Sequence, residues 1–247
     1  MTTAAATGNR TRWTAERRFY TGIALAMALV AYIGFARSFF LRPFFPDWPA
    51  PAEPIFVVHG IFFSAWCVLL VVQATLIGVR RVGLHRRLGL FGAVLAVGMI
   101  VLGLWGALVA ANRPTGFNLV PVPPLQFLVI PIFDLVFFGS FVALAVKWRA
   151  DAQAHKRLMV LATTSLLAAA FARWPYVWKI GNPFAYFGLA DLFIVALVVW
   201  DFRSRGSLHP VTRWGGLALI LSLPLRLALS ATPAWLAFAG WLTSLAR

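Results

Sequence analysis

Long apolar runs, separated by short basic or proline-containing segments, dominate the hydrophobic pattern of this chain. Each run holds about 20 predominantly apolar residues, the length that crosses the hydrocarbon core of a bilayer as an α-helix. The pattern therefore predicts an all-α, polytopic helical membrane protein with about seven transmembrane helices. The expected helices cover residues 19–40, 55–79, 88–112, 125–146, 158–178, 184–201 and 214–241.

Composition supports this class, because 61% of the residues are hydrophobic and only 12% are charged. Soluble domains average about 45–50% apolar and 25% charged residues. A net charge of +15 would suggest nucleic acid binding in a soluble protein. Here most basic residues precede the first run or fill alternate turns, the pattern of cytoplasmic loops, so no nucleic-acid partner is expected. They are Arg10, Arg12, Arg17, Arg18, Arg80, Arg81, Arg86, Arg87, Lys147, Arg149, Lys156, Arg157, Arg203, Arg205 and Arg213.

This charge distribution predicts the topology. The amino terminus is expected inside and the carboxyl terminus outside, with one helix followed by three hairpins that turn in the cytoplasm. Residues 1–18 are expected to be a basic cytoplasmic segment, and residues 19–247 a single transmembrane helical domain. The expected location is the cell (inner) membrane, as a multi-pass protein whose partner is the lipid bilayer; protein partners are not readable from the sequence.

Two related boxes begin two of the apolar runs: His85-Arg-Arg-Leu-Gly and His155-Lys-Arg-Leu-Met. At 3.6 residues per turn, the helical face that starts at each histidine is rich in small side chains. Such a face either lets helices pack closely or leaves a groove for a flat ligand. The two faces carry Gly89, Gly92, Ala96, Met99 and Gly103, and Met159, Ala162, Leu166, Ala169 and Arg173.

One hypothesis for the boxes is haem b. His85 and His155 would face one another at the inner ends of their helices and ligate the iron, while neighbouring basic side chains hold the propionates. His59, in the expected helix 55–79, is a further cofactor-binding candidate, although a hydrogen-bonded structural histidine is at least as common. The alternative is that the boxes are topology signals with an interfacial histidine. The basic candidates are Arg86, Arg87, Lys156 and Arg157.

Four charged residues lie well inside the expected helices, away from their ends: Asp134, Arg173, Asp191 and Arg226. Each charge costs on the order of 2.5–3.5 kcal/mol at the centre of a membrane helix, so the four are expected to find partners. Their charges sum to zero, and all four lie toward the outer half of the bilayer. They form either two interhelical salt bridges or, with His59, a polar chamber that opens outward.

Motifs of soluble enzymes are missing from the sequence. There is no metalloprotease H-E-x-x-H, no phosphate-binding glycine loop and no nucleophile elbow. The single cysteine, Cys67, excludes an intramolecular disulfide and a thiolate metal site. These absences leave open whether the protein is an enzyme.

The two boxes, with an arginine eighteen residues beyond the second histidine, resemble those of a family of uncharacterised bacterial multi-spanning membrane proteins with a domain of unknown function. The resemblance covers about residues 55–178. In that family an arginine often follows the methionine of the second box by two residues, where this chain has Leu161. The resemblance implies a helical membrane protein and supplies no activity. The residues that carry it are His59, His85, Arg86, Gly89, His155, Met159 and Arg173.

Two functional classes follow from these features. The first is a haem-binding membrane protein for electron transfer or for haem and oxidase handling, since similar histidine arrangements occur in transmembrane b-type cytochromes. The second is a cofactor-free transporter or channel-like protein that uses the charged cluster. An assembly or scaffold subunit is a third, plainer possibility. An absorption spectrum separates the first two.

Overall fold

The computed structural model of the chain describes residues 2–49, 53–117 and 122–246, with side chains from residue 15 onward. It is 83% helical, and the described residues contain no strand. The α-helices are α1 (Thr2–Phe35), α2 (Pro54–Gly78), α3 (Val82–Ala111), α4 (Pro124–Phe127), α5 (Val129–Lys147), α6 (Ala152–Phe171), α7 (Pro183–Arg205), α8 (Pro210–Ser230) and α9 (Pro233–Ser244). Short 3₁₀ or π segments lie at Ala36–Phe40, Arg42–Phe44 and Val177–Ile180.

Five helical segments in the described part of the chain are long and apolar enough to cross a membrane, or six if α8 and α9 form one broken span. The all-α, membrane-type fold is therefore confirmed, whereas seven spans are not. The five segments are Ala15–Phe40, Pro54–Gly78, Val82–Ala111, Pro124–Lys147 and Pro183–Arg205.

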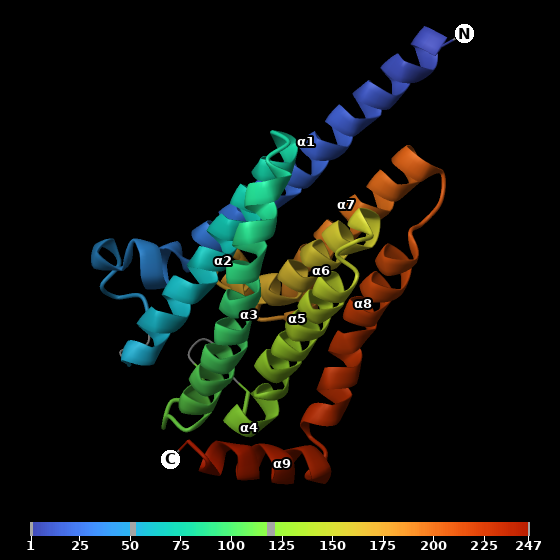
Figure 1. Cartoon of the computed structure of the whole chain (residues 1–247). Helices are drawn as coiled ribbons and strands as arrows, with labels where there is room; N and C mark the ends of the chain where they lie inside the picture. Colours follow the sequence, from blue (N-terminus) through green and yellow to red (C-terminus); the bar gives the residue numbers. More distant parts are fainter. Residues whose placement is uncertain (1, 50–52, 118–121, 247) are drawn as a thin grey trace.

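The expected basic segment 1–18 is not separate from the first helix. Helix α1 begins at Thr2 and continues to Phe35, so the chain enters the expected span without a break. The amino terminus and the turns α2–α3, α5–α6 and α7–α8 lie at the same end of the bundle (Figure 1). We call this the basic end, because the arginine-rich turns gather there. Whether the basic end faces the cytoplasm stays a prediction.

Caps and prolines explain where the helices start. Asp151 accepts hydrogen bonds from the backbone N–H groups of Gln153 and Ala154 at the start of α6, and Asn182 caps α7 in the same way. Proline stands at the first turn of α2, α7, α8 and α9, where its missing N–H costs nothing. Helix α7 ends at Arg205 and is capped by Gly206, whose φ of 73° suits glycine.

The expected single helix 214–241 is wrong. The chain bends by 88° between α8 and α9, and α9 lies across the end of the bundle beneath α4 (Figure 1). Thr232 caps α9, and Pro233 cannot continue α8, so this pair starts a new helix inside an apolar run. Trp235 Nε1 donates to the carbonyl oxygen of Leu125, at 2.9 Å, and fixes α9 in this position.

Helix α6 lies at the centre of the bundle, packed against α1, α5, α7 and α8. It is not among the five apolar segments, and most of its side chains are buried against protein. Alanine, serine and threonine suit such a position because they let neighbouring backbones approach. At Gly34 of α1 a Cβ atom would stand 2.4 Å from the carbonyl oxygen of Ala170, so these two helices meet backbone to backbone.

Candidate functional site

The structure brings the two box histidines together at the basic end. His85 lies in the first turn of α3 and His155 in the first turn of α6. Their ring centroids are 6.2 Å apart, and the ring planes are nearly perpendicular, at 88°. The two side chains were expected to face one another, and they do; a ligand role for them is a separate question.

Each histidine has a distinct hydrogen-bonding state. His155 Nδ1 lies 2.9 Å from the carbonyl oxygen of Ala145, in the last turn of α5. A proton on Nδ1 makes this contact a hydrogen bond and leaves Nε2 with a lone pair. His85 Nδ1 is buried and has no hydrogen-bond partner among the described residues. The side chain of Gln73 lies nearby, because its Nε2 donates to the carbonyl oxygen of His85 at 3.2 Å. Oε1 of Gln73 is also buried and has no partner among the described residues.

The basic residues of the two boxes differ in whether they are free to bind a ligand at the histidine pair. Arg86 and Arg87 are exposed beside His85. Lys156 instead forms an ion pair with Glu16 of α1 and lies 4.7 Å from the ring centroid of Tyr20. Arg157 is completely buried and bound to other groups, so it does not face a ligand at the histidine pair.

Arg157 forms the centre of a buried polar junction that joins α6, α7 and α8. Its Nε and Nη2 donate to Oδ1 of Asp201, and its Nη1 donates to two oxygens of Gln153 at 2.8 Å. The other oxygen of Asp201 accepts the backbone N–H of His209 at 3.0 Å. Both members of the ion pair have fully buried side chains. Every donor group of the guanidinium therefore has an acceptor.

His209 caps α8 next to this junction. Its Nδ1 accepts the backbone N–H of Val211 at 3.1 Å, which requires the unprotonated nitrogen. Burial lowers the pKa of His209, and the nearby Arg157 and Arg205 guanidinium groups lower it further, against the opposing carboxylates of Asp201 and Asp151. The folded protein therefore keeps this histidine neutral.

A pH-dependent loss of stability is expected from this cap. As the pH falls below the unfolded pKa of about 6.5, the unfolded chain takes up a proton that folded His209 refuses, so stability falls until the lower folded pKa is reached. Thermal unfolding of the detergent-purified protein between about pH 7.5 and 5.5 measures this loss. His209→Asn keeps a good capping oxygen but does not titrate, and it should show a smaller loss. Equal pH dependence in both proteins would contradict the assignment.

His59 lies elsewhere. It is near the start of α2, at the end of the bundle opposite to His85, and its ring stacks on Phe63 at a centroid distance of 4.0 Å. A Cβ atom at Gly106 of α3 would lie 3.9 Å from its Nδ1, which is buried and has no partner among the described residues. His59 therefore belongs to a different region from the histidine pair.

The charged residues in the expected outer half form one of two expected ion pairs. Arg226 Nη1 donates to Oδ1 of Asp134 at 2.5 Å, and both residues are buried. Arg173 instead donates to the carbonyl oxygen of Ala169 at 2.7 Å and lies 4.9 Å from the ring centroid of Phe35. Asp191 forms no ion pair with any described residue.

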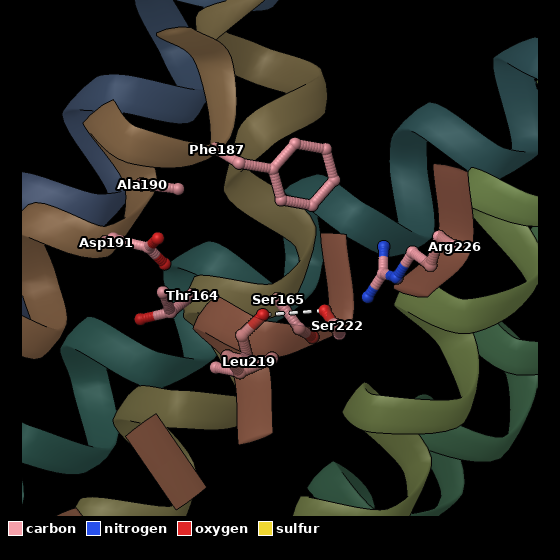
Figure 2. A pocket seen from close by; sticks show the side chains of 8 residues that line it. All are labelled: Thr164, Ser165, Phe187, Ala190, Asp191, Leu219, Ser222 and Arg226. Atoms are coloured by element: carbon pink, nitrogen blue, oxygen red, sulfur yellow. Dashed lines mark hydrogen bonds between the residues drawn. The ribbon is translucent and has the colours of Figure 1, made fainter. Parts of the chain in front are cut away.

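A small cavity lies between Asp191 and Arg226 and is lined by both polar and apolar side chains (Figure 2). The cavity lies between α6, α7 and α8. His59, on α2, does not line it. Its walls are Thr164, Ser165, Phe187, Ala190, Asp191, Leu219, Ser222 and Arg226.

The small-residue face of α3 is a packing surface along most of its length. A Cβ atom at Gly92 would stand 3.1 Å from Leu69, and one at Gly103 would stand 2.8 Å from Leu135. The first two turns are more open, because a Cβ atom at Gly83 would meet nothing within 4 Å, and one at Gly89 only the Gln73 amide at 3.7 Å. Any flat ligand at this face has room only near the basic end.

In the described part of the chain no three His, Cys, Asp or Glu side chains come together as a metal-binding group. No protein-family model matches the sequence, and neither a curated protein nor a solved structure matches it. The resemblance of residues 55–178 to an uncharacterised membrane family therefore stays a prediction.

Proposed function

We propose that this integral membrane protein binds haem b between His85 and His155, for electron transfer or haem handling. The observation that carries the proposal is the placement of the two rings, 6.2 Å apart at the same end of the bundle. Imidazole nitrogens bind metals at about 2.0–2.1 Å, so two rings at this distance could hold one metal group together.

The number of ligands favours haem over a bare metal ion. A zinc ion takes three or four protein ligands, and no third candidate ligand joins the two histidines among the described residues. Haem would bring four nitrogen ligands of its own, so His85 and His155 would be enough to hold it. The Nδ1 contact of His155 with the Ala145 carbonyl would fix its ring and leave Nε2 for the iron.

The surroundings assign roles to a few side chains. Arg86 and Arg87 are exposed in the first turns of α3, at the level where propionates would meet the headgroups. Lys156 and Arg157 are left out of that role, because each forms an ion pair with another helix. The open surroundings of Gly83 and Gly89 provide the space. When bound, such a haem would supply one-electron chemistry.

Absorption spectroscopy tests the proposal. The full chain, expressed with sufficient haem and purified in detergent, should show a Soret band that shifts on reduction. His85→Ala and His155→Ala should each lower haem content at least about tenfold, because even groups that only support a ligand contribute about that much to metal affinity. His59→Ala removes a histidine at the opposite end and should leave haem content unchanged. A wild type without haem, or two box variants that retain it fully, would refute the ligand role.

A cofactor-free transporter is the second candidate. The polar cavity beside Arg226 favours it, since ionisable groups inside a membrane bundle often mark an ion pathway. The same absorption spectrum separates the two candidates, because this function requires no chromophore.

A further inference from the structure

Arg226 of α8 has donor groups that the protein does not use. Only 1% of the residue is exposed, and its Nη1 binds Asp134, yet Nε and Nη2 have no partner among the described residues. These two nitrogens form one edge of the guanidinium. Buried donors are normally satisfied, by protein or by ordered water. The unsatisfied edge therefore indicates a ligand that the side chains do not provide.

Aromatic rings hold this guanidinium in place. Its central carbon lies 5.7, 5.4 and 5.3 Å from the ring centroids of Phe133, Phe137 and Phe187. The rings exclude lipid and water from the other faces of the side chain, and cation–π attraction stabilises its charge. The three rings therefore hold the guanidinium of a side chain that lines the cavity.

Acceptor oxygens line the rest of the cavity (Figure 2). Thr164, Ser165 and Ser222 each donate a hydroxyl proton to a carbonyl oxygen of their own helix, at 2.6 to 2.9 Å. Each hydroxyl oxygen keeps acceptor capacity toward a ligand. Asp191 of α7 adds a carboxylate on the wall opposite to Arg226.

Size and charge narrow the choice of ligand. The cavity measures about 10 Å³, which is room for about one water molecule and excludes an organic substrate. The charges of Asp134 and Arg226 cancel, whereas Asp191 has no cationic partner among the described residues. The remaining charged residues of α6, α7 and α8 lie at the basic end. A proton cancels the extra negative charge and needs no more room than the cavity offers.

We propose that Asp191, on the cavity wall opposite Arg226, is a proton-binding site within the membrane-type bundle, and that water in the cavity satisfies the free edge of Arg226. Asp191 is partly exposed on α7, and it also lines the cavity that would hold the water. The hydroxyl groups of Thr164, Ser165 and Ser222 orient that water. The site lies away from the histidine pair and does not depend on bound haem.

Infrared spectroscopy tests the site directly. Acidifying the purified full chain in lipid nanodiscs should produce a carboxylic-acid carbonyl band from Asp191. Asp191→Asn should abolish that band, and Asp191→Glu should restore an acid band at an altered frequency. Asp47→Asn is the matched control, because Asp47 is exposed; it should leave the band in place. A band that persists unchanged in Asp191→Asn, or no band in the wild type, would overturn the proposal.

A separate variant tests the role of the free guanidinium edge of Arg226. Arg226→Lys keeps a positive charge opposite Asp134 but has no planar fork of donors. It should therefore move the pH midpoint of the Asp191 band, since the water loses its fixed donors. Identical midpoints in the wild type and in Arg226→Lys would remove Arg226 from the site.

Discussion

Asp201→Leu is expected to destabilise the protein by about 3–5 kcal/mol, the cost of breaking a buried ion pair. The substitution leaves the fully buried Arg157 guanidinium without its counter-charge. It also removes the acceptor of the His209 backbone N–H at the α7–α8 turn. Thermal unfolding in detergent, followed by circular dichroism, measures the loss.

Two controls isolate the charge effect. The double variant Arg157→Met with Asp201→Leu should lose less stability than Asp201→Leu alone, because no unpaired charge stays buried. Glu53→Gln breaks a more exposed pair, whose side chains are 38% and 13% exposed, and should cost less than about 1 kcal/mol. If the double variant loses the sum of both single losses, the buried charge is not the cause.

The helices could be predicted where the length of the apolar run and the residues of the flanking turns indicate the same helix ends. The runs 55–79 and 184–201 match α2 and α7 within a few residues, since prolines and caps bound them. The prediction of one helix over 214–241 was wrong because apolar side chains continue through the bend. Only two residues, Thr232 and Pro233, mark the break. A helix start can thus be hidden inside a uniformly apolar segment.

The site could be predicted only in part, because some of its contacts join residues that are far apart in the sequence. His85 and His155 each lie at the start of a helix at the basic end. The charges of the loops and the lengths of the apolar runs therefore predicted that the two residues lie at equal depth. The ion pair of Arg157 and Asp201 joins residues 44 apart on different helices, and nothing local shows that either side chain points inward. From the sequence, Arg157 resembles the other basic residues of the expected cytoplasmic loops, and its partner Asp201 is recognised only when α7 is placed beside α6.

The four intramembrane charges illustrate the same limit. Charge balance required partners, and Asp134 with Arg226 supplies one pair. The sequence could not show that Arg173 would find a carbonyl oxygen one turn back, which needs no acid. That local solution leaves Asp191 without a cationic partner among the described residues.

Replacing both Asp134 and Arg226 with leucine should leave stability unchanged or raise it by about 1–4 kcal/mol, whereas either single replacement should cost about 3–5 kcal/mol. This pair differs from the Arg157 junction, because two of the three nitrogens of its guanidinium lack partners among the described residues and its desolvation is poorly offset. The apolar pair would pack against the surrounding phenylalanine rings.

The same thermal unfolding assay decides the outcome. A double variant that unfolds as easily as the worse single variant would show that the pair itself stabilises the bundle. If instead the double variant is at least as stable as the wild type but loses the pH response of the Asp191 infrared band, the charged pair costs stability and is retained for the site. Such a trade between stability and activity is expected where a buried charge serves function.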